Sequence, residues 1–247
     1  MKDMYFLCSL PRAGNTVISS ILNQDKRIKV TSNSITCEIV YQIQKLKEDG
    51  LFINFPDSGS LDNVINNVFN MYYKDWKANT IIDRSSWGTP ANLFSLRHMY
   101  KSPKFIILYR PVIECLSSYV KALTPGDLDV FCEEVMDKDN GVIGKNLWSI
   151  ENILKNKEDH IIIHFKDFIN NPIKELKKIY KYTNNKYKDI NLKNFKQFSI
   201  NNIHYNDKIL GADIHKIRTS YISHTSYDYK KILSSKIINK YKNRDVL

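Results

Sequence analysis

Short apolar runs alternate along the chain with longer segments in which apolar residues recur every three or four positions. The runs are rich in β-branched residues and apolar on both faces, as buried parallel strands are, and comprise Met4–Ser9, Thr80–Asp83, Lys104–Tyr109 and His160–Phe165. The longer segments predict helices at Asn15–Asn23, Thr36–Lys47, Leu61–Lys77, Pro90–Tyr100, Val112–Leu123, Pro172–Tyr182 and, as one long helix, within Leu128–Lys155. This alternation predicts an α/β fold in which helices cover both faces of a parallel sheet of about four to five strands.

The periodicity weakens after Leu192. Residues 204–226 predict an irregular segment, which in a compact domain is usually functional or disordered, and Tyr227–Tyr241 predicts a terminal helix. A chain of 247 residues with no long linker suits a single domain.

Composition narrows the possible partners. A formal charge of +11 and a pI near 9.3 favour nucleic acid, a membrane surface, or small phosphorylated or sulfated molecules, although scattered lysines are also typical of a solvated surface. The four cysteines are far apart and form no zinc or disulfide pattern, which predicts reduced thiols in a cytoplasmic protein. The first apolar run, between Asp3 and Pro11, is too short for a signal peptide. No run approaches the roughly 20 apolar residues of a membrane span.

A candidate phosphate-binding loop, "SLPRAGNT", follows the first predicted strand at residues 9–16. It has the outline of a Walker loop, but Asn15 stands where the lysine belongs and Arg12 supplies the cation instead. Gly14 allows close backbone approach, and the following helix offers unpaired N–H groups to an anion. A nucleoside triphosphate fits poorly without the lysine, whereas a 5′-phosphate with one transferable group fits better. The residues expected to bind this anion are Pro11, Arg12, Ala13, Gly14, Asn15, Thr16 and Val17.

A second candidate binding segment is "KFIILYRPVIECLSSYVK", at residues 104–121. Arg110 stands at the carboxyl end of the predicted strand, and Ser118 lies about two helical turns along the next helix. Ligands of open α/β sheets bind at the carboxyl ends of strands, so Arg110 and the loop are expected at one site. Taken alone, either residue could simply cap or pack a helix.

These two segments together resemble the two signature regions of the sulfotransferase superfamily. A third segment, "IIIHFKDFINNPIKELKKIYKYTN", is similar to a block that follows the fourth strand in that family. The resemblance covers roughly residues 4–24, 79–122 and 160–184. Arg12 stands where cytosolic members have lysine, as in the tyrosylprotein and bacterial carbohydrate branches. The resemblance implies a P-loop-like fold and an enzyme that transfers a sulfuryl group from 3′-phosphoadenosine 5′-phosphosulfate (PAPS) and releases adenosine 3′,5′-bisphosphate (PAP).

The resemblance also implies roles for individual residues. Arg12 would stabilise charge on the bridging oxygen, Thr16 and the loop amides would hold the 5′-phosphate, and Arg110 with Ser118 would bind the 3′-phosphate. Val17 replaces the tryptophan that stacks on adenine, and Phe165 replaces a family tyrosine. Near the C-terminus, a basic loop that closes over the donor in the family would correspond here to Lys216 and Arg218. No metal is implied.

The general base cannot be carried over from the family. Cytosolic members have a histidine after the strand that matches Thr80–Asp83, but the run here is Asp83-Arg84-Ser85. Glu38, on a predicted helix, and Asp83, at a strand end, are the candidate bases. Each has a structural alternative, as a surface carboxylate or as the ion-pair partner of Arg84.

The domain is expected to carry helical insertions on the acceptor side near residues 32–76 and 124–156, and an irregular segment at 192–226. The acceptor is expected to be a hydroxyl or amine of a small molecule, carbohydrate or peptide. A P-loop kinase is an alternative function, because Asp83 resembles a magnesium-binding acid. A basic protein that binds nucleic acid without catalysis is another, although no recognised binding module is present and no specific nucleic acid is expected as a partner. The sequence leaves the oligomeric state open.

Overall fold

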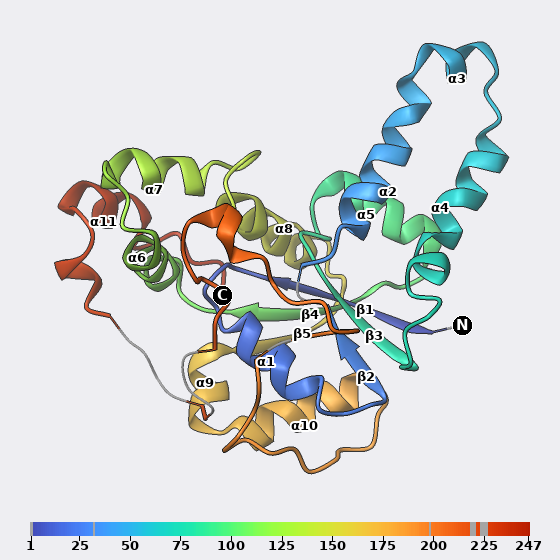
Figure 1. The fold of residues 1–247 in the computed structure, drawn as a ribbon. Coiled ribbons are helices and arrows are strands. Elements are labelled where there is room, and N and C mark those ends of the chain that lie inside the picture. Colours follow the sequence, from blue (N-terminus) through green and yellow to red (C-terminus); the bar gives the residue numbers. More distant parts are fainter. Residues whose placement is uncertain (1, 32, 198, 218–220, 223–226) are drawn as a thin grey trace.

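The computed structural model describes residues 2–31, 33–197, 199–217, 221–222 and 227–247. Five parallel strands form one sheet in the order β2-β3-β1-β4-β5 (Figure 1). The strands are β1 (Asp3–Ser9), β2 (Ile28–Val30), β3 (Thr80–Arg84), β4 (Lys104–Tyr109) and β5 (Asp159–His164). The predicted α/β fold is therefore confirmed. Strand β2 was not predicted, because three residues are too few to show a pattern.

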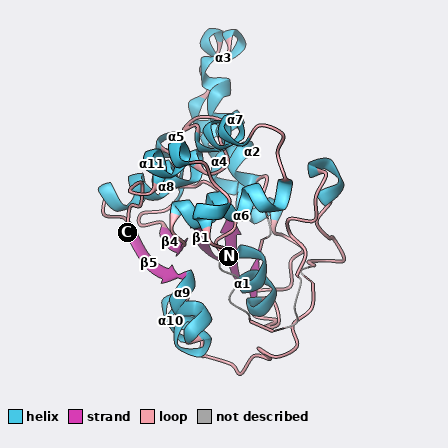
Figure 2. Cartoon of the chain, turned by 90° about the vertical axis from the view of Figure 1, so that its left-hand side faces the viewer, coloured by secondary structure: helices cyan, strands magenta, loops and turns pink. Residues whose placement is uncertain are grey.

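Helices cover both faces of the sheet, as predicted (Figures 1 and 2). On one face lie α1 (Asn15–Leu22), α9 (Phe165–Asn170) and α10 (Pro172–Tyr182). The other face carries α5 (Pro90–Met99), α6 (Val112–Leu123), α7 (Leu128–Met136), α8 (Gly144–Lys155) and α11 (Ser235–Tyr241). Helices α2 (Thr36–Lys45) and α4 (Ser58–Tyr72) form an arm that projects from the body, with η1 (Leu46–Glu48) and α3 (Gly50–Asn54) near its tip.

An aromatic cluster joins the central strand to the helices above it. The ring of Phe6 on β1 lies 5.3 Å from Trp87 and 5.6 Å from Phe69, measured between centroids. All three side chains are at most 2% exposed. The Phe6–Trp87 pair is edge-to-face, and such a pair contributes about 0.5–1.5 kcal/mol beyond the burial of its apolar area. The cluster fixes α4 and the loop after β3 against the sheet, and so fixes the carboxyl end of β3.

Two helix predictions were wrong in extent. The single helix expected within Leu128–Lys155 is two helices, α7 and α8, because the Asp137 carboxylate accepts hydrogen bonds from the backbone N–H groups of Asp139 and Asn140 and closes a turn. The helix expected at Leu61–Lys77 ends at Tyr72, and its start at Ser58 is set by Asp57, which accepts from the backbone N–H of Ser60.

The end of the chain is less helical than predicted. Within Tyr227–Tyr241 a short 3-10 helix, η3 (Tyr229–Lys231), is followed by α11, which Ser234 caps. The irregular segment expected at 204–226 contains η2 (Asp207–Leu210) in the part that the structure describes. Phe165 begins α9 rather than ending β5. No helix in the described ranges is long and apolar enough to cross a membrane. All four cysteines are free thiols and buried.

Candidate functional site

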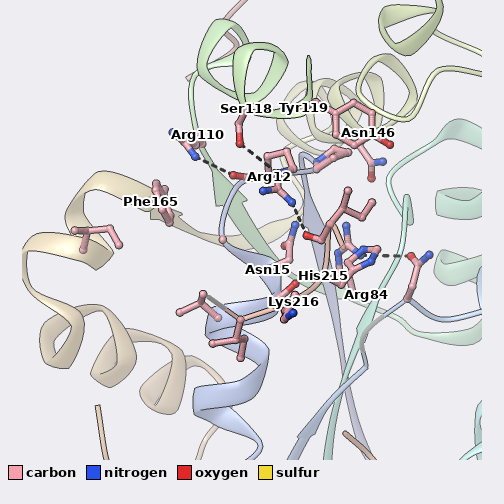
Figure 3. A pocket seen from close by; sticks show the side chains of 18 of the residues that line it. Arg12, Asn15, Arg84, Arg110, Ser118, Tyr119, Asn146, Phe165, His215 and Lys216 are labelled. Carbon is pink, nitrogen blue, oxygen red and sulfur yellow. Dashed lines mark hydrogen bonds between the residues drawn. The ribbon is translucent and has the colours of Figure 1, made fainter. Parts of the chain in front are cut away.

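A pocket of about 350 Å³ lies where β1, β3 and β4 end (Figure 3). Its lining comes from the loop after β1, the start of α1, Arg84 at the end of β3, and Arg110 just after β4. Helix α6 and residues 214–217 also contribute to the lining, although residues 214–217 lie about 200 positions from the loop. The pocket therefore occupies the place where parallel α/β sheets bind ligands.

The loop after β1 is shaped for an anion. Gly14 caps α1 with φ 91°, a left-handed conformation, and a Cβ atom there would come within 2.6 Å of the Phe165 ring. Asn15, in the place of the lysine, donates from Nδ2 to the Leu10 carbonyl at 2.9 Å and so holds the loop together. Thr16 and Val17, which line the pocket, open a helix whose first turn has no acidic residue. The N–H groups and positive dipole end of α1 therefore favour an anion in the pocket.

Arg12 joins three parts of the chain within the pocket. Its own backbone is left-handed, with φ 67°. Its Nε donates to Ser118 Oγ of α6 at 3.2 Å, and its Nη1 donates to the carbonyl of Ile214. The guanidinium is thus aimed across the loop, between α6 and the C-terminal segment (Figure 3).

Arg110 is fixed beside the loop and is 5% exposed. Its Nε donates to Glu114 Oε2 at 2.9 Å, and its Nη1 donates to the backbone carbonyl of Arg12 at 3.1 Å. Its guanidinium also lies 4.8 Å from the centroid of the Phe165 ring. The structure therefore brings together Arg12, Arg110, Ser118 and Phe165, which the sequence suggested from separate segments.

The other end of the pocket contains two residues that sequence reasoning did not select. Arg84 Nε and Nη1 lie 3.4 Å from Ser9 Oγ and Asn33 Oδ1, and burial lowers the pKa of its guanidinium. His215 pairs with a carboxylate, because its Nδ1 lies 2.6 Å from Asp207 Oδ1. Position directly after a buried strand could have indicated Arg84. No local pattern indicated His215, because it lies in an irregular segment.

The two carboxylates predicted as bases do not line the pocket. Asp83 is fully buried and accepts hydrogen bonds from Thr36 Oγ1 at 2.6 Å, from Trp87 Nε1 at 3.0 Å and from the Tyr73 hydroxyl. Burial raises the pKa of Asp83. Glu38 is exposed on α2 and accepts from the side chain of Gln42. Glu38 and Asp83 are not among the residues that line the pocket, and their assignment as bases stays a prediction from the sequence.

Only some of the remaining predicted site residues line the pocket. Pro11 and Lys216 line the pocket, and the exposed Lys216 ammonium lies 3.4 Å from Asp213. Ala13 is fully buried in the core below the loop. Arg218 lies outside the described residues. Within the described ranges, no group of three or more His, Cys, Asp or Glu side chains has the arrangement of a metal site.

The sheet and its covering helices define an α/β protein, as the sequence predicted, and the pocket at the strand ends contains Arg12, Arg84 and Arg110. The profile of the sulfotransferase domain family matches residues 2–244, and the chain belongs to that family. It is therefore a transferase with sulfotransferase activity. Comparison with curated protein sequences gives no match.

Solved structures share this fold at low identity. The sulfotransferase domain from the curacin biosynthetic pathway is 13% identical, with a TM-score of 0.57 and 97% of each chain covered. Mouse sulfotransferase SULT7A1, complexed with PAP, is 14% identical, with a TM-score of 0.55, covering 98% of this chain and 82% of the mouse chain. A sulfotransferase from Alicyclobacillus acidocaldarius is 12% identical, with a TM-score of 0.53, covering 77% of this chain and 83% of that one.

Proposed function

We propose that the chain transfers a sulfuryl group from PAPS to a hydroxyl or amine of a small-molecule, carbohydrate or peptide acceptor. The observation that carries this proposal is the convergence of Arg12, Ser118 and Arg110 on one pocket at the carboxyl ends of the strands. A donor with phosphate groups at both its 5′ and 3′ positions requires two cationic subsites at a fixed separation. A ligand with a single phosphate would use only one of the two pocket arginines, Arg12 and Arg110.

The residues present fit PAPS in detail. The 5′-phosphosulfate would lie on the loop amides and Thr16, within reach of Arg12, while Arg110 and Ser118 would bind the 3′-phosphate. Arg110 is suited to this role because Glu114 and the Phe165 ring hold its guanidinium in place. The missing loop lysine disfavours a nucleoside triphosphate, as the sequence suggested. The mouse structure with bound PAP supports the nucleotide class by analogy of fold.

The proposed reaction is an in-line displacement at sulfur. The acceptor oxygen or nitrogen attacks sulfur, its proton passes to a base, and the bond from sulfur to the bridging oxygen breaks. The electron pair stays on the 5′-phosphate of PAP, where Arg12 would stabilise the growing charge. Catalysis is then mainly positioning and charge stabilisation by arginine, for which no metal is required.

The acceptor is proposed to enter from the side opposite Arg110. The predicted acceptor-side insertions contribute Asn33, Val142 and Asn146 to the pocket wall, and the C-terminal segment contributes residues 214–217. These contributions support the division of one domain into a donor-binding core and variable acceptor-side segments. The cytoplasmic location stays a prediction from the sequence.

Nucleotide binding gives the first test of this function. PAP at a hundredfold excess over its Kd stabilises a protein by about 2.7 kcal/mol, which a thermal shift assay detects. We expect AMP, which lacks the 3′-phosphate, to stabilise the chain much less. Equal shifts with AMP and PAP would remove the role of Arg110 and Ser118.

Turnover gives the second test. PAPS is incubated with a panel of phenols, alcohols, amines, sugars and tyrosine peptides, and products carrying an added sulfate are detected by mass spectrometry. Activity is expected to persist in excess EDTA. ATP-dependent phosphorylation that stops on chelation and returns with Mg²⁺ would favour a kinase instead.

A further inference from the structure

We infer that His215 is the general base that accepts the acceptor's proton, and that Asp207 is the positioning residue that orients it. The inference rests on the proposed function and names the group that the proposed displacement still lacks. Both residues come from the irregular C-terminal segment, and His215, labelled in Figure 3, lines the pocket.

The imidazole is held rigidly from two sides. Asp207 accepts a hydrogen bond from the backbone N–H of His215 at 2.8 Å through Oδ2 and contacts its Nδ1 at 2.6 Å through Oδ1. The Tyr205 ring stacks on the imidazole with centroids 4.0 Å apart and an interplanar angle of 1°. A side chain in such a position loses little further conformational entropy when a substrate arrives.

The contact with Asp207 also sets the tautomer. An ionised carboxylate only accepts hydrogen bonds, so the proton of the neutral imidazole belongs on Nδ1. Nε2 then carries the lone pair, which is the form that a general base requires. The His215 side chain is 21% exposed and lines the pocket, so an acceptor in the pocket can reach the ring.

Burial is the main reason why the pKa of His215 is lowered, which favours the neutral imidazole near neutral pH. Burial lowers the pKa of His215 and the positive charges of Arg84 and Arg12 lower it further, while Asp207 acts in the opposite direction. Lys216, the next residue, also lines the pocket but is exposed and lies near Asp213. The net direction is downward from about 6.5. A base that is already neutral at pH 7 is available for proton transfer.

His215 is also placed correctly with respect to the donor. Its neighbour Ile214 accepts a hydrogen bond from Arg12, the residue proposed to stabilise the bridging oxygen. In Figure 3, Arg110 and Phe165 lie on one side of Arg12, and His215 and Arg84 lie on the other. A donor whose 3′-phosphate lies at Arg110 would therefore direct its transferable group toward His215.

In the resulting step, the acceptor O–H bond breaks and its proton moves to Nε2 as the oxygen–sulfur bond forms. The sulfur–oxygen bond of PAPS breaks, and its electron pair stays on the phosphate. The imidazolium ion is stabilised by Asp207 until it releases the proton to solvent. Atoms and charges balance without an additional reactant.

The first experiment compares His215→Gln with His204→Ala, a matched control in which an exposed histidine of the same segment is removed. The rate of PAP release from PAPS is measured with water as acceptor, beside the PAP-induced thermal shift. We expect His215→Gln to lower the rate by at least about 100-fold and to keep the thermal shift, because a general base contributes about 10²–10⁴ in rate. His204→Ala should keep both.

The Asp207→Asn variant shows whether Asp207 orients His215 or only stabilises the fold. The carboxylate raises the pKa of His215, so its removal should move the acid limb of the pH–rate profile to lower pH as well as reduce the rate. A loss of rate at every pH with no movement of the limb would contradict the positioning role. Nitrogen-15 NMR of the histidine ring should show the Nδ1-protonated tautomer in the PAP complex, and the opposite tautomer would overturn the inference.

The outcomes distinguish the two proposals. If PAP stabilises the wild-type chain but His215→Gln releases PAP as fast as wild type does, only the assignment of His215 is overturned. If PAP does not stabilise even the wild-type chain, the proposed function fails, and the assignment of His215 fails with it.

Discussion

The two ends of the pocket are built in different ways. At the end proposed to bind the donor, the Arg110 guanidinium contacts the Glu114 carboxylate of α6, the Arg12 carbonyl of the loop after β1 and the Phe165 ring at the start of α9. At the end proposed to bind the acceptor, Arg84 lies 3.4 Å from Ser9 Oγ and Asn33 Oδ1, and His215 comes from an irregular segment. The first end is built where three strands pass into the helices that follow them, whereas the second combines two strand ends with the loop residue Asn33 and with His215 of the C-terminal segment.

This difference matches the two tasks that the proposed function gives to the pocket. A nucleotide with two phosphate positions needs cations at an invariant spacing, and strand ends packed on helices supply it. An acceptor of variable shape needs side chains that can change without disturbing the sheet, and loops supply those. We therefore expect substitutions at the donor end to change nucleotide affinity, and substitutions at the acceptor end to change turnover.

Arg12 lies between the two ends and should show the largest effect. Its charge matters most when the bridging oxygen becomes negative, so Arg12→Ala should lower kcat by about 10²–10³ while the affinity for PAP falls far less. Arg12→Lys should recover part of the rate, because it keeps the charge but loses the planar fork. Steady-state kinetics and PAP calorimetry on both variants measure this.

The control is Arg97→Ala, which removes an arginine of α5 that pairs with Glu158 outside the pocket. It should leave kcat unchanged. Near-normal turnover by Arg12→Ala would mean that Arg12 only positions the donor.

Substitution of Arg110 should affect the affinity for PAP more than kcat, the opposite of what is expected for Arg12. Removing a hydrogen bond to a charged group costs about 1.5–3 kcal/mol, so Arg110→Ala should weaken PAP binding by about 10–100-fold, with a smaller loss of kcat. Ser118→Ala should act in the same direction but less strongly. Isothermal titration with PAP and with AMP distinguishes the 3′-phosphate contact, because AMP affinity should change little. An equal loss for both nucleotides would place Arg110 elsewhere in the mechanism.

The sequence predicted the donor end because its signals are local. A strand, a loop with Gly14 and a helix follow one another within 20 residues, and Arg110 and Ser118 lie eight positions apart on one strand–helix unit. The parallel sheet then brings both units to one edge. The bounds of α6 and α10 agree with the predicted residues for the same reason, since the apolar period and the proline at the start of α10 are local.

The acceptor end was not predictable because its residues either lie in a segment without a periodic pattern or make contacts with distant parts of the chain. Asp207 and His215 meet through a fold of an irregular segment, and Ile214 reaches Arg12 across 202 positions. Asp83 illustrates the opposite case: its place at a strand end suggested chemistry, but three side-chain donors from Thr36, Tyr73 and Trp87 surround it. The place of Asp83 at a strand end does not show whether its carboxylate faces the pocket or accepts hydrogen bonds from other side chains in the core.

Gly14→Ala tests how tightly the donor end is built, with a smaller expected effect. The left-handed backbone costs a non-glycine residue about 1–2 kcal/mol, and the new Cβ would press on the Phe165 ring. We expect the free energy of unfolding to fall by at least this amount, measured by urea denaturation.

Adding Phe165→Leu to Gly14→Ala should recover only part of the loss, because it relieves the contact but not the backbone strain. Gly126→Ala is the matched control, since a Cβ there meets no neighbouring atom within 4 Å. Full recovery in the double variant would mean that the ring contact alone requires glycine at position 14.

The smallest effect should come from pH, acting on the acceptor end. Burial lowers the pKa of His215 below its value in the unfolded chain, so the folded state binds fewer protons in this range. Stability from this group is therefore present above about pH 6.5 and is lost as the pH falls. Asp207 also has a lowered pKa, but the stability that it contributes is lost only below about pH 4.

Between about pH 8 and about pH 5, the melting temperature of the wild-type chain should therefore fall further than that of His215→Gln. The melting temperature of His204→Ala should depend on pH as that of wild type does. The other four histidines are present in all three proteins, so their contributions do not affect the comparison. Parallel curves for wild type and His215→Gln would show that the acceptor end does not hold a buried neutral imidazole.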